Sequence, residues 1–353
     1  MNVKNIFKIA AEKKASDLHL MVGREPILRI DGELFTINSV WPGKEYYEIL
    51  TDTDLSVVLD FLLNKEQKVT FYNDKDLDFG YSLDGIRFRV NFSFEKDHLR
   101  LVARVIEETK PTLDEIGMPD TIKTLLEAHQ GLVLVTGPTG CGKSTTLAAM
   151  INYINSTRSC NIVTLEDPIE YIFKPKMSII SQRQLGSDMI SFSSGLKHAL
   201  RQDPNVIMIG EMRDLETIST AITLAETGHL VLATLHTYSA AQTVDRIIDI
   251  FPPYQQNQIK SQLSFVLSAI ISQRLLNKNG GGRIAAREIL LNNSAIANLI
   301  REGKVAQIKS VIETGSAAGM ITMDKHVKQL YKDGIITKEV AMGQLGDPGL
   351  LGE

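Results

Sequence analysis

One glycine-rich stretch near the middle of the chain constrains the fold more than any other feature. Residues 131–136 form a short apolar run that is typical of a buried strand. The next residues are Gly137-Pro138-Thr139-Gly140-Cys141-Gly142-Lys143-Ser144-Thr145, which match the phosphate-binding loop pattern of a glycine, four residues and then Gly-Lys-Ser. Residues 145–155 contain neither Gly nor Pro and predict a helix. Strand, loop and helix together favour a phosphate site over a chance match in a glycine-rich turn.

The chemistry of a bound nucleotide explains these residue types. Glycines let backbone N–H groups turn inward around phosphate oxygens, and the helix N-terminus adds the positive end of its dipole. We expect Lys143 to reach the β- and γ-phosphates of ATP and the Ser144 hydroxyl to ligate Mg²⁺. Cys141 lies where a thiol pKa can fall, so a redox role stands beside the simpler reading of a small loop residue.

Composition restricts the class of protein. The chain of 353 residues is long enough for two domains, and its hydrophobic (43%) and charged (23%) fractions are ordinary for a globular protein. A formal net charge of −4 gives no overall electrostatic reason to bind nucleic acid. The sequence shows no run as long as a membrane span, no apolar signal core and only two cysteines. We therefore expect a cytoplasmic protein that reaches a membrane only through partners.

The first hundred residues predict an α+β unit. Helices are expected at residues 1–15 and 54–71, and hairpins at the turns Asp31-Gly32 and Asp84-Gly85. Strands 86–94 and 99–106 alternate, so apolar residues share one face while Arg89 and Arg104 lie on the other. These arginines belong either to a solvated sheet face or to a contact with phosphate bound elsewhere.

A polar, proline-containing segment, residues 107–115, is interpreted as a linker between domains of residues 1–106 and 116–353. After it, apolar strands alternate with helices, the pattern of a mostly parallel sheet covered on both faces. From residue 255 to 353 we expect a mainly helical part, because Ile259, Leu263, Val266 and Ile270 have helical spacing. The tail from Gln344 is expected to be poorly ordered.

Two carboxylates follow strands of this second unit. The strand at 161–165 leads into Glu166, and the strand at 206–209 leads into Gly210 and Glu211. Ligands of open parallel sheets bind at the carboxyl ends of strands, so both carboxylates should converge on the phosphate loop. We assign Glu211 to polarising the attacking water and Glu166 to binding Mg²⁺ or positioning water. The alternative for both is a helix cap or a pair with Arg213.

His229 and His236 bracket the apolar run 230–235 and are expected to converge on the same loop. A metal site is disfavoured, because the two histidines are seven residues apart and have no third His or Cys beside them. We favour a hydrogen-bonding role beside the γ-phosphate or at a subunit interface.

Longer motifs extend the similarity to a known family. They are Ser16-Asp17-Leu18-His19-Leu20, Gly137 to Thr145, Leu165-Glu166-Asp167-Pro168-Ile169-Glu170-Tyr171, Leu200-Arg201-Gln202-Asp203-Pro204, Gly210-Glu211-Met212-Arg213-Asp214, Glu226-Thr227-Gly228-His229, Thr234-Leu235-His236-Thr237 and Ile296-Ala297-Asn298-Leu299-Ile300-Arg301-Glu302. Through them the chain resembles the type II/IV secretion ATPase superfamily over nearly its whole length, and within it the type IV pilus retraction (twitching motility) ATPases.

The resemblance implies a PAS-like N-terminal domain, a RecA-like ATPase domain, and a homohexamer with ATP and Mg²⁺ between subunits. It also implies a place at the cytoplasmic face of the inner membrane, with pilus platform proteins as partners. The site residues that it implies are Glu211 as the catalytic carboxylate, Glu166, His229 and His236 as lining, and Arg89 and Arg104 approaching the nucleotide. Relative to the family pattern, Asn205 replaces an Asp, Cys141 a Ser and Ala297 an Arg.

Other functions stay open at this stage. Assembly and secretion ATPases of the superfamily carry an extra N-terminal domain and a four-cysteine metal site, and the chain shows neither. An accessory retraction ATPase, a nucleic-acid motor on the same core, and a scaffold that binds ATP without turnover are the remaining alternatives. The near-neutral charge opposes the nucleic-acid motor, and the presence of Glu211 opposes the scaffold.

Overall fold

The structure, a computed structural model, describes residues 2–30, 32–42, 46–106 and 111–345. It divides into two compact units: the first holds the N-terminal elements and Pro168–Ile172, and the second holds residues 111–167 and 173–345. Residues 107–110 of the predicted linker, the turn residue Asp31 and the tail after Leu345 lie outside the described residues. Among the described residues, no helix is both long enough and apolar enough to cross a bilayer.

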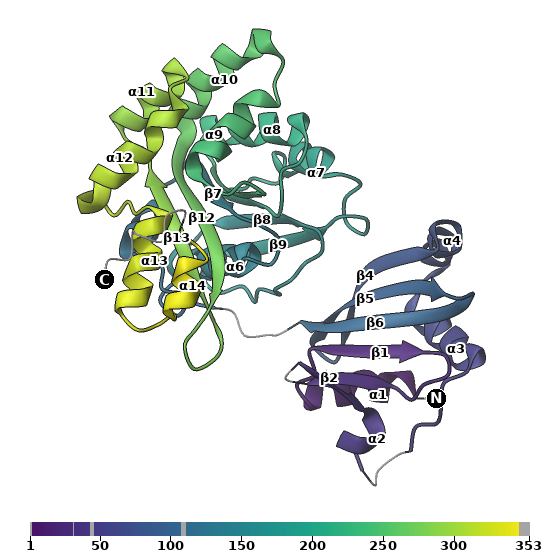
Figure 1. Ribbon diagram of the computed structural model, residues 1–353. Coiled ribbons are helices and arrows are strands. Elements are labelled where there is room, and N and C mark those ends of the chain that lie inside the picture. The colour runs from purple at the N-terminus through teal and green to yellow at the C-terminus, as the bar shows by residue number, and fades with distance from the viewer. Residues whose placement is uncertain (1, 31, 43–45, 107–110, 346–353) are drawn as a thin grey trace. The chain divides into compact units, whose positions relative to one another are not determined.

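The first unit is an antiparallel sheet with strand order β3-β2-β1-β6-β5-β4 (Figure 1). The alternation predicted for residues 86–94 is confirmed, because Phe88, Val90 and Phe92 are fully buried on the core face of the sheet. The strands are β1 (Asp17–Met21), β2 (Ile27–Ile30), β3 (Glu33–Thr36), β4 (Asp76–Leu83), β5 (Ile86–Glu95) and β6 (His98–Ile106), and the helices are α1 (Val3–Glu12), α2 (Ile37–Val40), α3 (Asp52–Leu62) and α4 (Lys65–Asp74).

The single helix predicted over residues 54–71 is wrong, because α3 and α4 divide it. Asn64 caps α4: its side chain accepts a hydrogen bond from the Gln67 backbone N–H (2.8 Å), and the Gln67 side chain accepts one from the Asn64 N–H (3.0 Å). This reciprocal capping box satisfies two backbone donors at a helix start. The capping box therefore stabilises the start of α4 at a point where the spacing of apolar residues alone predicted that the first helix continues.

The second unit is the predicted mostly parallel sheet, with order β13-β12-β7-β11-β10-β8-β9 and helices on both sides (Figure 1). Strand β7 is flanked by β11 and β12, both parallel to it. The strands are β7 (Gly131–Thr136), β8 (Asn161–Glu166), β9 (Ile179–Gln184), β10 (Val206–Ile209), β11 (Leu230–Leu235), β12 (Leu267–Asn277) and β13 (Arg283–Leu291). The helices are α5 (Asp120–Leu126), α6 (Lys143–Thr157), α7 (Phe192–Ala199), α8 (Leu215–Glu226), α9 (Ala240–Asp249), α10 (Pro253–Val266), α11 (Ser294–Glu302), α12 (Ile308–Thr314), α13 (Met323–Lys332) and α14 (Lys338–Met342), with 3₁₀ turns at Val305–Gln307 and Gly315–Ala318.

The prediction that residues 255–353 are mainly helical is wrong for residues 267–291. Helix α10 ends at Val266, and the chain continues as β12 and β13, a hairpin that closes through residues 278–282. The helical stripe therefore breaks before Ile270, which lies fully buried in β12. The reason is tertiary: β12 completes the hydrogen bonding of β7 on its open side, and sheet pairing outweighs local spacing.

Strand β13 contacts α13 through His326, whose ring nitrogen lies against the backbone of Arg287. His326 Nδ1 lies 2.9 Å from the Arg287 backbone N, whose N–H it can accept, and 3.2 Å from the Arg287 carbonyl oxygen. Burial, the largest cause, lowers the pKa of His326; the hydrogen bond with the Arg287 backbone opposes this effect, and the charge of Arg287 adds to it.

The lowered pKa of His326 predicts a loss of stability in acid. As pH falls below the ordinary histidine pKa of about 6.5, the unfolded chain binds the proton first, and unfolding becomes easier by up to about 1.4 kcal/mol per pH unit. Between pH 7.5 and pH 5.5 the thermal midpoint of the wild type should therefore fall further than that of His326→Gln, which cannot titrate. Equal falls in the two proteins would show that this histidine is not held neutral by the fold.

Candidate nucleotide-binding and hydrolysis site

The phosphate loop follows β7, whose six residues are all buried. The loop has positive φ at Gly137 (144°), Gly140 (77°) and Gly142 (90°), values that side chains other than glycine rarely adopt. Gly142 is also the N-cap of α6 and provides no side-chain cap. No side chain of the N-cap residue therefore accepts from the first N–H groups of α6. N–H groups at a helix N-terminus in this arrangement bind phosphate.

Lys143 and Ser144 lie in the first turn of α6. The Lys143 ammonium Nζ donates to the carbonyl oxygens of Gly137 (2.8 Å) and Pro138 (3.0 Å), so the side chain folds back along the loop. Ser144 is half-buried in the same turn. The ammonium and the hydroxyl are thus placed beside the backbone N–H groups on which phosphate oxygens would lie.

Glu211 follows Gly210, the first residue after the end of β10, as predicted. Its carboxylate contacts the Arg213 guanidinium (Nε–Oε1, 2.8 Å) and the His236 ring (Nε2–Oε2, 3.6 Å), with 18% of its side chain exposed. The pair with Arg213 is the alternative that the sequence left open. Because the Arg213 side chain is 74% exposed, this pair contributes little energy and leaves the carboxylate available.

Gly210 lets the chain before Glu211 approach the backbone that carries the second carboxylate, Glu166. A Cβ at Gly210 would lie 3.2 Å from the Leu165 carbonyl oxygen and 3.4 Å from the Glu166 Cα, and the Gly210 N–H donates to Leu165 O at 2.8 Å. Glu166, at the end of β8, is only 7% exposed and accepts from Thr164 Oγ1 (2.7 Å) and Gln182 Nε2 (3.0 Å). These hydrogen bonds fix its carboxylate at the same sheet edge as Glu211.

The two histidines do not converge, which corrects the expectation from the sequence. His236 follows β11 and reaches Glu211, whereas His229 precedes β11. The parallel strand separates them by roughly 20 Å. His229 instead pairs its Nδ1 with the Leu224 carbonyl (3.0 Å) and lies at the amino ends of the strands. The apolar run between the two histidines forms the whole of β11, so the histidines lie at opposite ends of that strand.

Arg89 and Arg104 pair across β5 and β6 on the face opposite the buried phenylalanines. Arg104 Nε donates to Asp17 Oδ1 at 2.9 Å, and Arg89 Nη2 lies 3.4 Å from Asp78 Oδ2. Their side chains are 65% and 40% exposed. They belong to the first unit, and the second unit contains the phosphate loop.

Cys141 does not have the environment of a reactive thiol. Burial raises its pKa, outweighing the lowering effect of Lys143, so the thiol stays protonated near neutral pH. The raised pKa favours the simpler reading of Cys141 as a small loop residue over the redox role. Sequence reasoning also missed Gln273 on β12, whose amide Nε2 donates to the Cys141 carbonyl at 2.9 Å. No spacing rule connects residues so far apart in the chain.

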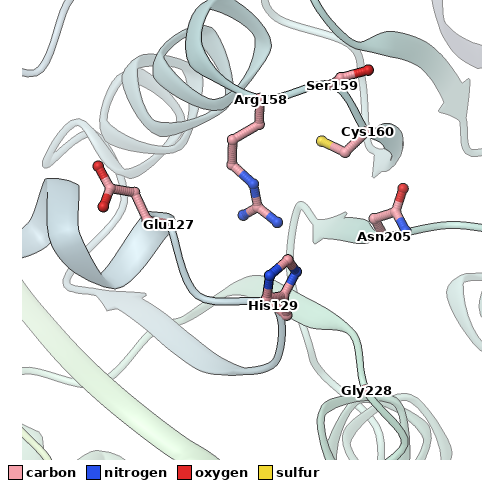
Figure 2. Close-up of a pocket in the computed structure, with 7 residues that line it drawn as sticks. All are labelled: Glu127, His129, Arg158, Ser159, Cys160, Asn205 and Gly228. Carbon is pink, nitrogen blue, oxygen red and sulfur yellow. The ribbon is translucent and has the colours of Figure 1, made fainter.

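A polar cavity of about 410 Å³ lies at the other edge of the sheet, before the strands begin (Figure 2). Arg158 lies at its centre and donates to the carbonyls of Leu126 (2.6 Å) and Ala128 (3.0 Å). Its lining is Glu127, His129, Arg158, Ser159, Cys160, Asn205 and Gly228. Asn205 accepts from the Asn161 N–H (2.8 Å), so its role here is structural. The cavity includes no predicted catalytic residue.

The fold and site define a P-loop ATPase: an α+β N-terminal unit is followed by a RecA-like unit that carries the phosphate loop and two carboxylates at one sheet edge. This confirms the predicted fold class. Residues 72–332 match the family described as Type II/IV secretion system protein, and the chain belongs to that family.

Individual relatives are similar over nearly their full length. The chain is 44% identical to the type IV pilus retractation ATPase PilT of Pseudomonas aeruginosa over 97% of both chains. It is 45% identical to the twitching motility protein of Neisseria gonorrhoeae, covering 90% of this chain and 83% of that protein. The crystal structure of the pilus retraction motor PilT with bound ADP superimposes with a TM-score of 0.90 at 44% identity, covering 99% and 98% of the two chains.

Proposed function

We propose that this protein is a homohexameric, ATP-driven motor that withdraws pilin subunits from the base of a type IV pilus and so drives twitching. The observation that carries the proposal is the similarity to two retraction and twitching proteins over nearly the whole chain, in a molecule with a complete phosphate loop. Its place would be the cytoplasmic face of the inner membrane, held there by pilus platform proteins. We further propose residues 1–106 and 116–353 as its domains, joined through residues 107–115.

The proposed chemistry follows from the residues at the sheet edge. Lys143 and the loop N–H groups hold the phosphates, and Glu211 polarises the water that attacks the γ-phosphorus. Ser144 and Glu166 offer hard oxygen ligands, which fit Mg²⁺. The metal, when bound, neutralises charge on the β- and γ-phosphates. His236 lies beside one carboxylate oxygen of Glu211 and Arg213 contacts the other, so both help to position the carboxylate.

The hexamer accounts for the site residues that one chain does not bring together. Hydrolysis needs positive charge on the γ-phosphoryl oxygens beyond what one lysine supplies. We propose that Arg89 and Arg104 supply it from the N-terminal domain of a neighbouring subunit, exchanging their exposed pairs with Asp78 and Asp17 for phosphate. His229, distant from the loop of its own chain, is proposed to act at a subunit interface.

The test is to count surface pili and measure twitching in cells without the protein and in cells that carry Lys143→Ala. Retraction predicts many pili and no twitching in both strains. Loss of pili in both would mean that the motor assembles pili, and a partial loss of twitching would indicate an accessory retraction ATPase. A defect in the deletion strain alone would indicate a scaffold that works without turnover.

A further inference from the structure

Gln273 on β12 is in direct contact with the back of the phosphate loop. Its strand neighbour Ser272 pairs with Thr136, the last residue of β7, so Gln273 lies level with the start of the loop. The Gln273 side chain is 1% exposed. The backbone of β12 also approaches the loop, because a Cβ on Gly137 would collide with the Gln273 carbonyl oxygen.

The Gln273 amide joins two parts of the site. Its Nε2 donates to the Cys141 carbonyl oxygen at 2.9 Å, inside the loop, and its Oε1 accepts from Thr146 Oγ1 at 3.0 Å, in the first turn of α6. Thr146 and Cys141 are 2% and 3% exposed, so water cannot replace either bond. One side chain therefore fixes the loop relative to the helix that follows it.

The bond to Cys141 determines which way one peptide faces. In a planar trans peptide the C=O and the next N–H point in opposite directions. Holding the Cys141 carbonyl toward β12 consequently turns the Gly142 N–H toward the inside of the loop. Gly142 has a φ of 90° and no Cβ, so its peptide rotates easily once released. A rotated peptide would point a carbonyl oxygen at the phosphates in place of a donor.

We propose that Gln273 is the positioning residue of the phosphate loop: it holds the Cys141–Gly142 peptide in the orientation that binds nucleotide phosphate. The inference rests on the nucleotide site proposed above and adds to it a residue from a strand outside the strand–loop–helix motif. The Nε2 donor is the part of the side chain that matters most, since it alone touches the loop peptide.

The test measures ADP affinity in three variants of the full-length protein. Gln273→Met removes both hydrogen bonds, and Gln273→Glu keeps the acceptor for Thr146 but loses the donor for Cys141. Ser272→Ala is the matched control, because it removes a buried bond of the adjacent residue (Thr136 Oγ1 to Ser272 Oγ, 2.8 Å) that does not touch the loop. At pH 8 we expect the dissociation constant for ADP to rise about tenfold in both Gln273 variants and to stay unchanged in Ser272→Ala.

A pH series separates positioning from general destabilisation. The buried carboxyl introduced by Gln273→Glu, beside a carbonyl oxygen, would have a raised pKa, and once protonated it could donate to the Cys141 carbonyl. The ratio of the Gln273→Glu dissociation constant to that of the wild type should therefore fall toward one between pH 8 and pH 6, while the Gln273→Met ratio stays constant. The titratable groups that face this position are the Cys141 thiol and Lys143; because the Gln273 side chain contacts the thiol, Gln273→Met, which loses the same contact, is the baseline for Gln273→Glu.

Each result has one meaning. Wild-type affinity in both Gln273 variants would overturn the positioning role, and so would a Gln273→Glu ratio that does not change with pH. A wild-type protein that does not bind ADP would instead contradict the nucleotide site itself. Thermal midpoints measured beside each titration confirm that the variants are folded at the temperature used.

Discussion

Lys143→Ala is expected to reduce ATP hydrolysis by about 10³-fold, or roughly 4 kcal/mol in the activation free energy. The Lys143 ammonium donates to the carbonyl oxygens of Gly137 and Pro138, so its positive charge lies at the phosphate loop. Without the ammonium, the loop binds phosphate through its backbone N–H groups. These groups are fixed in place, so they cannot move with the negative charge that develops on the leaving oxygen. Phosphate release at saturating ATP measures the effect.

The control for this variant is Lys176→Ala. Lys176 contacts the far end of the same helix, through Asn152 Oδ1 (3.3 Å) and Ser156 Oγ (2.9 Å). The Lys176→Ala variant should hydrolyse ATP at the wild-type rate, because the interactions that it loses are exposed and distant from the loop. Hydrolysis by Lys143→Ala within about threefold of the wild type would mean that the loop is not the site of turnover.

Glu211→Gln is expected to retain nucleotide binding and to lose turnover by about 10²- to 10³-fold. The carboxamide has nearly the same shape and can still accept from Arg213, but it cannot take a proton from the attacking water. Affinity for ADP should therefore stay within about twofold of the wild type while kcat falls. The two quantities are measured by ligand titration and by phosphate release on the same preparation.

Glu216→Gln is the matched control for the carboxylate. Glu216 lies in the first turn of α8, is exposed, and pairs with Lys197 rather than with Arg213 or His236. It should leave kcat unchanged. If Glu211→Gln hydrolyses ATP normally, the assignment of the water-polarising residue fails and Glu166, on the neighbouring strand, becomes the residue to test.

Local pattern was sufficient wherever a few neighbouring residues determine the outcome. The phosphate loop needs three glycines with positive φ followed by a helix start, and all of these are read within nine residues. The alternation of β5 likewise places Phe88 and Arg89 on opposite faces whatever the strand pairs with. For these parts the printed sequence and the fold agree.

The local sequence pattern was insufficient where the structure of a segment depends on a residue or strand far away in the chain. Helical spacing continued through Ile270, yet pairing with β7 makes that segment a strand. His229 was expected at the loop, but the strand that separates it from His236 carries it to the other end of the sheet. Gln273 gave no signal at all, because its role depends on Cys141 and Thr146, which lie 132 and 127 residues earlier in the chain.

The central position of β7 also bears on how the molecule folds. Both neighbours of this strand come later in the chain, and the bond from Thr136 to Ser272 spans 136 residues. Closing such long loops costs chain entropy before any contact is gained, so these pairings form slowly. During synthesis the N-terminal unit can fold first, whereas β7 waits for β11 and β12 to leave the ribosome. The nucleotide pocket is therefore one of the last parts to assemble, and ATP or ADP can stabilise only late folding species.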